Sequence, residues 1–443
     1  MNNNNLTESI RKFLYYLFVL YIIYATDSLF FSTNYNQSVV KASQYFIILL
    51  TAVFTIKYLM LKHKKSDFLL LLTICFFLFF SMFVTGDYTG GYFLKIALFA
   101  FSYFFFEICD ADRFINTFLK IMKVIAVVSL IGFLFSAFIS EISFLPILKN
   151  TLQREYISLI FANIPVRLDL QNRNYGPFWE PGVYQAYLIV ALFFSLFYKK
   201  ENNKFNIVLF TITMITTFST TGIIALFFLF AGYVLHSSKK DMNDTKLKWL
   251  VALLLFAGGL YLLLDQNIWE LVFRKLALGT ESASFSSRWN AIGANIYIIL
   301  QYPFFGCGPN GASVLLYLYL NNIQQTGTFF NVNTILAHFS IYGLLVGIYF
   351  MWNIGRFING FIEKNILTKG LILLTIICIL SGENFMYSLF FNMIFFINGS
   401  HLEREETAEE DTVSQSIYIK NDGFQDLKFI SNRGKRRNGN FAG

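Results

Sequence analysis

The chain has 443 residues, of which 56% are hydrophobic, 19% aromatic and only 14% charged. Soluble domains carry about a quarter charged residues, so the composition excludes a soluble protein and predicts an all-α, polytopic integral membrane protein. The net charge of +8 does not indicate a nucleic-acid partner, because the basic residues form short clusters between apolar runs.

Twelve apolar runs are predicted to form transmembrane helices, each of which needs about 20 residues to cross the hydrocarbon core. The N-terminal sequence MNNNNLTESIRKF does not look like a cleaved signal, so the first run is predicted to be the first span. The predicted spans are 13–31, 45–61, 68–84, 92–109, 121–139, 183–198, 205–218, 222–235, 249–264, 332–352, 370–380 and 385–397.

Lys and Arg residues predict the orientation of these spans, because cytoplasmic loops carry an excess of both. They precede the first span and follow every even-numbered span up to the tenth. We therefore expect both termini in the cytoplasm and two long external loops, at 140–182 and 265–331. Residues 1–401 form the predicted membrane domain, and residues 402–443 are predicted to be a disordered cytoplasmic tail.

Two runs are predicted to break into paired short helices. Run 205–235 is too long for one span, and a single helix would put the basic residues at its two ends on opposite sides of the membrane. We place its break at residues 219–222 and a similar break in run 370–397 at residues 381–384. Non-helical backbone at membrane depth needs partners from protein or a wet cavity, so the breaks indicate a cavity that opens outward. The alternative is an ordinary hairpin turn outside the bilayer.

The end of the first long loop, residues 172–182, carries the first candidate site. Gly176 is predicted to form a turn with the proline that follows it, and Pro181 suits the first turn of the next helix. Arg173 offers a planar fork of donors for a phosphate, and Glu180 could act as a base or orient one. The alternatives are that Glu180 only complements the helix dipole and that Arg173 contacts lipid headgroups.

The second long loop contains a predicted amphipathic helix on the outer membrane surface. Ser287 is its predicted N-cap and Pro303 ends it. Arg288 would lie in the first turn, where a helix N-terminus also favours a phosphate; the alternative is that Arg288 faces lipid headgroups. The predicted apolar stripe consists of Trp289, Ile292, Ile296, Ile299 and Leu300.

The tenth span carries two polar candidates, Asn333 near its external end and His338 deeper. A histidine inside a span is a functional hypothesis by default, and the alternative is a packed histidine that bonds to a neighbouring helix. Other charged residues lie in or near spans, including Lys95 within the fourth run. Glu383 is the most suggestive of them, because it lies in the second helix break.

Taken together, these segments resemble the O-antigen polymerase and ligase superfamily. The resemblance covers about residues 165–350. The matching positions are Arg173, Gly176, Glu180 and Pro181; Ser219 and Gly222; Arg288, Pro303, Gly306 and Gly308; and Asn333, Gly343 and Gly347. The break reads Ser-Thr-Thr-Gly and lacks the family's arginine, and the usual histidine position falls on Val332. The second departure favours a polymerase over a ligase.

The resemblance implies a glycosyltransferase of the bacterial inner membrane that joins undecaprenyl-pyrophosphate-linked repeat units into O-antigen or capsular polysaccharide at the periplasmic face. Arg173 and Arg288 would bind the pyrophosphate. Glu180, His338 and Asn333 would be the catalytic candidates, with Gly176, Ser219, Gly222, Gly306 and Gly308 as supporting turns. We rank Glu180 above His338 as the residue nearest the chemistry, and we expect the helix N-terminus to lower the pKa of Glu180.

The implied partners are the lipid-linked oligosaccharide, membrane lipid, and the chain-length regulator and flippase of the same pathway. No metal or other cofactor is expected, because lipid pyrophosphate is already a good leaving group and no metal-type spacing of cysteines occurs. Two alternative functions remain at this point. One is an O-antigen ligase that transfers polysaccharide to lipid A core, and the other is a lipid-linked oligosaccharide flippase or another transporter.

Overall fold

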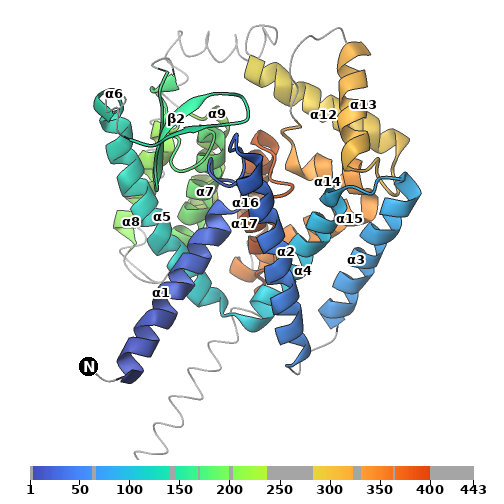
Figure 1. Cartoon of the computed structure of the whole chain (residues 1–443), viewed down its shortest axis with the longest axis horizontal. Helices are drawn as coiled ribbons and strands as arrows, with labels where there is room; N and C mark the ends of the chain where they lie inside the picture. The colour runs from blue at the N-terminus through green and yellow to red at the C-terminus, as the bar shows by residue number, and fades with distance from the viewer. Residues whose placement is uncertain are drawn as a thin grey trace, which may run out of the picture.

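Helices account for most of the described chain, as the sequence predicts (Figure 1). The computed structural model describes residues 3–61, 66–139, 145–167, 170–198, 203–236, 283–322, 331–362 and 365–399. The predicted span 249–264 and the predicted tail 402–443 lie outside these residues.

The N-terminal part is built from long helices that follow the first five predicted spans. They are α1 (Asn3–Tyr24), α2 (Gln37–Leu59), α3 (Ser66–Thr85), α4 (Gly90–Ile108), α5 (Ala111–Leu134) and the short α6 (Ser136–Ile139). Side chains of Asn36 and Asp110 cap α2 and α5 by accepting backbone N–H bonds in the first turn. The first predicted span extended to residue 31, but α1 ends at Tyr24. Beyond it, Ser28 forms a β-bridge with Phe178 instead of continuing the helix.

A small antiparallel sheet, which the sequence analysis did not predict, occupies the first long loop. Its strands are β1 (Ile147–Lys149), β2 (Glu155–Leu159) and β3 (Ala162–Pro165), in the order β1-β2-β3. In Figure 1 the sheet lies at the end of the molecule opposite the N-terminus. The Asn163 amide donates to the carbonyl of Gly176 at 2.6 Å, so the sheet supports the segment that leads to Glu180.

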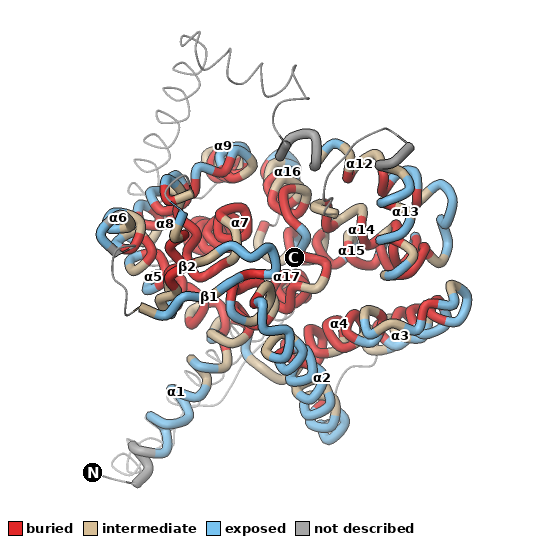
Figure 2. Tube along the Cα trace, turned by 45° about the horizontal axis from the view of Figure 1, so that its top comes forward, coloured by how far each residue is buried: buried red, intermediate tan, exposed pale blue. Residues whose placement is uncertain are grey.

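The C-terminal part mixes full-length and short helices. Its elements are α7 (Pro181–Phe193), which continues as the π-helical turn η2 (Phe194–Tyr198), α8 (Lys204–Thr216), α9 (Thr220–Leu235), α12 (Ala283–Gln301), α13 (Pro309–Asn322), α14 (Thr334–Tyr342), α15 (Leu344–Phe361), α16 (Ile366–Gly382) and α17 (Leu389–Ile394). Figure 2 shows that α7, α14 and α17 are buried at the centre, whereas α1 and α2 have exposed outer faces.

The predicted break in run 205–235 is confirmed. Helix α8 ends at Thr216, Phe218 adopts a positive φ of 48°, and α9 begins at Thr220. The Ser219 hydroxyl caps α9 by accepting from the amide of Gly222 at 3.4 Å. Gly222 therefore lies in the first turn of α9 rather than in the break itself.

Run 370–397 also breaks at the predicted place, because α16 ends at Gly382. The helix that follows, α17, has only six residues, and all of them are buried. At 1.5 Å per residue it rises about 9 Å, far less than the roughly 30 Å of the hydrocarbon core. The predicted twelfth span is thus a short internal helix in the described chain.

The tenth predicted span is interrupted at Gly343, which the sequence analysis missed. Gly343 adopts φ +87° between α14 and α15, and a Cβ there would lie 2.0 Å from the carbonyl oxygen of Phe304. The loop before α13 packs into this interruption: the amides of Cys307 and Gly308 donate to the carbonyls of Ser340 and Ile341, both at 3.0 Å. The Pro-x-x-Gly-x-Gly stretch and the glycine-interrupted helix therefore form one unit.

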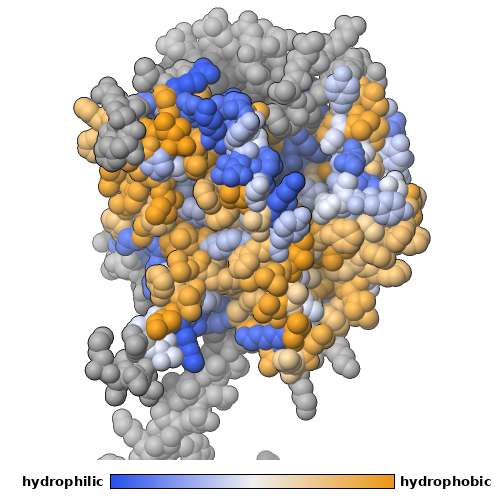
Figure 3. Space-filling view, viewed as in Figure 1, coloured by the Kyte–Doolittle hydropathy of each residue, from blue (hydrophilic) through white to orange (hydrophobic). Residues whose placement is uncertain are grey.

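The surface of the described chain is that of a membrane-embedded protein. Five helices are long and apolar enough to cross a membrane, namely α2, α3 from Asp67, α4, α5, and α7 together with η2. Large apolar side chains are exposed along α2 and α3, including Leu49 and Phe76. Figure 3 shows a broad hydrophobic band across the middle of the molecule, with hydrophilic side chains above and below it. A band of this kind favours contact with lipid rather than water.

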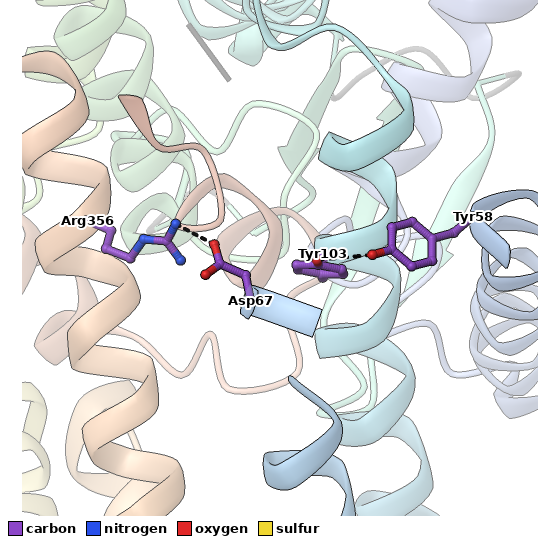
Figure 4. A network of polar contacts seen from close by, with 4 residues as sticks. All are labelled: Tyr58, Asp67, Tyr103 and Arg356. Atoms are coloured by element: carbon purple, nitrogen blue, oxygen red, sulfur yellow. Dashed lines mark hydrogen bonds and ion pairs between the residues drawn. The ribbon is translucent and has the colours of Figure 1, made fainter. Parts of the chain in front are cut away.

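Polar pairs join the ends of helices far from the sheet. Arg356 on α15 forms an ion pair with Asp67 in the first turn of α3, with 2.7 Å between the guanidinium nitrogen and the carboxylate oxygen (Figure 4). Nearby, the hydroxyls of Tyr58 and Tyr103 lie 3.3 Å apart and link α2 to α4.

Candidate functional site

Glu180 is the N-cap residue of α7, directly before Pro181 at the start of the helix. Its backbone is extended (φ −148°, ψ 145°), and within the described chain its carboxyl makes no capping hydrogen bond. Glu180 therefore does not cap the helix through a hydrogen bond, and the alternative that its charge complements the helix dipole stays open. The preceding turn is set by Gly176, whose φ of +54° and contact with the Tyr184 ring leave no room for a side chain.

Arg173 connects the same segment to the break between α8 and α9. Its Nε donates to the carbonyl of Thr217 at 3.0 Å. The neighbouring Asn174 amide group donates to the hydroxyl of Thr216 at 3.1 Å. The side chains of Arg173 and Asn174 thus bind the segment that precedes Glu180 to the end of α8.

Arg288 reaches the other helix break from α12. Its Nε lies 3.4 Å from the carbonyl of Gly382, to which it donates. Two predictions about this helix are wrong: α12 begins at Ala283, so Ser287 is not its N-cap and Arg288 lies in the second turn. No glycine or proline stops the helix between Ala283 and Ser287. Pro303 follows the end of α12 at Gln301, as predicted.

Three of the five residues in the predicted apolar stripe of α12 are exposed, and the other two, Ile292 and Ile299, are half-buried. Trp289, Ile296 and Leu300 are 67%, 46% and 77% exposed, while Ile298 is buried. Large apolar side chains on the outer face fit a helix that contacts lipid there.

Glu383 is the site residue that the sequence analysis noted but did not place in the site. It is the C-cap residue of α16 and is buried. Its backbone carbonyl accepts from the hydroxyl of Thr334 at 2.8 Å, and that hydroxyl accepts from the amide of Phe385 at 2.7 Å. A Cβ on Gly182 would lie 1.8 Å from Glu383 Oε1, so the carboxyl rests on the first turn of α7, close to Glu180.

The four charged side chains act on one another. Burial raises the pKa of Glu180, and the charges of Arg173 and Arg288 oppose that rise. Burial raises the pKa of Glu383 further, Glu180 adds to the rise, and the same two arginines oppose it. The expectation that the helix N-terminus lowers the pKa of Glu180 is therefore wrong, because the cost of removing the carboxylate from water is the larger effect.

Gln185 on α7 carries a side-chain amide without a partner in the described part of the chain. Both polar atoms of the Gln185 side chain are buried and have no hydrogen-bond partner among the described residues. Its Oε1 would be 2.9 Å from a Cβ on Gly222 in the first turn of α9. Unsatisfied buried amides are rare in proteins and often mark functional sites or sites for an ion or water.

His338 lies elsewhere in the core and has its own partners. It is buried on α14, with Nδ1 2.7 Å from the carbonyl of Thr334 and Nε2 2.5 Å from Nζ of Lys95 on α4. Lys95 also donates to the carbonyl of Met386 at 3.0 Å and to Oδ1 of Asn392 at 2.6 Å. The arrangement is that of a histidine bonded between helices.

The remaining predicted residues have local roles in the structure. Asn333 is the N-cap of α14, and its Oδ1 accepts from the amide of Leu336 at 2.9 Å. Gly306 and Gly308 adopt φ values of +70° and +75° in the loop that packs against the α14–α15 interruption. Ser219 caps α9, as described above.

Sequence reasoning had a signal for Glu383 and Lys95, since each is a charge within or beside an apolar run. It had none for Gln185, because an amide in an apolar helix becomes informative only when its neighbours are known.

Comparison with known proteins adds no relatives. No protein-family model matches the sequence, and neither a curated protein nor a solved structure matches it. The chemistry of the site therefore rests on its own residues: two guanidinium groups and two carboxyls, contributed by the end of the first long loop, by α12 and by the end of α16.

Proposed function

We propose that this chain is a membrane glycosyltransferase that polymerises undecaprenyl-pyrophosphate-linked oligosaccharide repeat units. The observation that carries the proposal is the meeting of Arg173 and Arg288, far apart in sequence, at one pair of carboxyls beside two helix breaks. Arginine forks recognise phosphate oxygens in a bidentate manner. Carboxylates within the same cluster supply the base that activation of a sugar hydroxyl requires.

In this reaction the growing chain leaves its lipid pyrophosphate and is transferred to a hydroxyl of the incoming repeat unit. Arg173 and Arg288 neutralise the charge that develops on the departing pyrophosphate. Glu180, the N-cap residue of α7, orients the arginines and the acceptor. His338 and Asn333 stabilise α14. Thr334 on the same helix bonds to the main chain at the end of α16.

The proposed topology is that of a polytopic protein of the bacterial inner membrane, with both termini cytoplasmic. The sheet and the cluster around Glu180 are then periplasmic, where lipid-linked repeat units are polymerised. Basic residues at the opposite helix ends favour this orientation: Lys57 lies in the last turn of α2, and Arg113 and Lys204 lie in the first turns of α5 and α8. The proposed partners are the chain-length regulator and the flippase of the pathway.

A deletion strain examined by lipopolysaccharide gel tests the function. A polymerase predicts loss of the polysaccharide ladder while a single repeat unit remains on the lipid A core, with recovery of the ladder on complementation. Loss of every repeat unit would instead indicate the ligase or the flippase. An unchanged lipopolysaccharide pattern together with loss of capsule would assign the same chemistry to capsular polysaccharide.

A further inference from the structure

We propose that Glu383 is the catalytic base that removes the proton from the acceptor hydroxyl. The inference rests on the proposed polymerase function and assigns the base to a residue that the family resemblance does not supply. Glu383 lies at the end of α16 with its carboxyl against the first turn of α7, between the segments that carry Arg173 and Arg288.

The carboxyl of Glu383 is available for a substrate. Among the residues described by the structure, no hydrogen bond to either of its oxygens is found, and neither oxygen is one of the fully buried atoms without a partner. Both therefore keep some contact with the surface, although the residue is only 4% exposed. A buried carboxylate without a partner is costly, and such groups concentrate at functional sites. A substrate hydroxyl that donates to one of these oxygens would satisfy it.

The main chain of Glu383 is held in place on both sides. Thr334 donates to its carbonyl, and Arg288 donates to the carbonyl of Gly382 directly before it. Thr334 is itself tied to His338, whose ring nitrogen bonds the Thr334 carbonyl. Lys95 donates to the carbonyl of Met386, three residues after Glu383. The carboxyl thus projects from a backbone whose position is set by two other helices.

Three other described candidates for a base have hydrogen-bonding partners in the protein. His338 contacts Lys95 through one ring nitrogen and the Thr334 carbonyl through the other. Asp27 accepts hydrogen bonds from Tyr187 and Ser388 through one carboxylate oxygen. Asp87 accepts from the backbone amides of Asn310 and Thr89. Glu180 is more exposed than Glu383 and is left to orient the substrates.

Electrostatics suit this role. Burial and the neighbouring Glu180 raise the pKa of Glu383, which strengthens it as a base, while the charges of the two arginines oppose that rise. A base works best when its pKa is near the working pH, because both its strength and its ionised fraction then contribute.

The step is balanced without any further reactant. Glu383 accepts the proton from the acceptor hydroxyl, and that oxygen forms a bond to the anomeric carbon of the donor sugar. The bond from this carbon to the pyrophosphate oxygen breaks, and the electron pair leaves on the lipid pyrophosphate, whose charge Arg173 and Arg288 neutralise.

The test uses the full chain in proteoliposomes with undecaprenyl-pyrophosphate-linked repeat units purified from a deletion strain. Glu383→Gln is expected to lower kcat by about 100-fold or more, since general base catalysis contributes roughly 10² to 10⁴-fold. Binding of undecaprenyl pyrophosphate alone should be unchanged or tighter, because a negative charge beside the arginines is removed. Glu155→Gln, at an exposed glutamate on β2 that pairs with Lys149, is the matched control and should keep full turnover.

Two further variants keep the test independent of folding. Glu383→Asp should retain more activity than Glu383→Gln. Gly182→Ala leaves the charge of Glu383 in place but displaces its carboxyl, and it should also lower kcat. The kcat of the wild type should rise with pH, with a midpoint above the ordinary pKa range of a carboxyl group, because the base must be ionised. The residual kcat of Glu383→Gln should not show this rise.

The inference is overturned if Glu383→Gln keeps more than a tenth of the wild-type kcat, or if it loses donor binding in the same proportion as turnover. Polymer formation by the wild type together with either result would leave the proposed function standing. Failure of the folded wild-type chain to form polymer would overturn the proposed function and this inference with it.

Discussion

Arg173 and Arg288 use their guanidinium groups in the same way. In each, Nε donates to a main-chain carbonyl at a helix break, that of Thr217 or that of Gly382. The carbonyl fixes the plane of the fork, and within the described chain the terminal nitrogens remain for a ligand. Under the proposed function, each arginine bonds to the carbonyl and to the pyrophosphate at the same time, whereas a lysine has a single nitrogen for both contacts.

We therefore predict that Arg173→Lys and Arg288→Lys each lower polymerisation by roughly tenfold or more, because a hydrogen bond to a charged group contributes about 1.5–3 kcal/mol. The measurement is the rate of polymer formation in membranes at equal protein levels. Arg11→Lys, at an exposed arginine on α1, is the control. Normal rates for both site variants would rule out the pyrophosphate role.

The two other catalytic candidates differ in what surrounds them. Glu180 lies at a helix start near both arginines, whereas His338 is fully buried and bonded on both ring nitrogens. We predict that Glu180→Gln gives folded protein with little polysaccharide ladder. We expect His338→Ala to lower the amount of folded protein, because Lys95 loses a partner in the core, but to keep more of the ladder at matched levels. Loss of the ladder in the histidine variant alone would reverse this ranking.

At the scale of elements, the site is assembled from helix ends rather than from helix interiors. The ends of α8 and α16 and the starts of α7 and α9 meet around Gly182, Gly222 and Gly382, where the absence of side chains permits close approach. Helix ends also provide unpaired backbone groups that bind charged ligands. The interrupted helix α14–α15 supports this arrangement, since Thr334 at its start holds Glu383.

The interruption at Gly343 gives a sharp test of the fold. Gly343→Ala places a Cβ against Phe304 in a left-handed backbone conformation, and we expect it to destabilise the protein by roughly 2 kcal/mol or more. Gly355→Ala, on the same α15 with nothing near the new Cβ, is the matched control and should stabilise by about 0.5–1 kcal/mol. Thermal unfolding in detergent measures both. Equal melting temperatures for the two variants would contradict the packing of the loop against α14–α15.

At the scale of the whole molecule, polar groups gather at two ends and an apolar band lies between them (Figure 3). The sheet lies at one end, and the N-terminus lies at the other (Figure 1). Under the proposed function, the segment that leads from the sheet to Glu180 lies outside the hydrocarbon region, where a hydrated sugar reaches it, while the lipid part of the substrate stays in the bilayer.

The proposed orientation predicts opposite compartments for two exposed positions. Leu152, beside the sheet, should be periplasmic, and Met60, after α2, should be cytoplasmic; they are 46% and 79% exposed. In a chain whose four cysteines are replaced by alanine, a membrane-impermeant thiol reagent should label Leu152→Cys in spheroplasts and Met60→Cys only after lysis. Labelling of both positions in intact spheroplasts would refute the topology.

The sequence predicted helical structure and membrane character, because apolar length is a local property of the chain, and five described helices are long and apolar enough to cross a membrane. The sequence left the number of spans and their orientation as predictions. It also determined the break at Ser219, since the signal is a short run of polar residues within an apolar one. The small sheet escaped prediction because its strands are short and gain stability from pairing with each other. Similarly, Gly343 looked like an ordinary helix residue until the Phe304 loop was seen to occupy the space beside it.

Only the tertiary structure decided which charged residues belong together. The sequence singled out Arg173, Arg288 and Glu180 but placed Arg288 at a helix start and expected an ordinary acidic Glu180. The uninterrupted start of α12 puts Arg288 in a second turn. Packing partly buries Glu180 and brings Glu383 against Gly182 from the far end of the chain. Burial and long-range proximity set the energy of a charge, and neither can be read from the neighbours of a residue in the sequence.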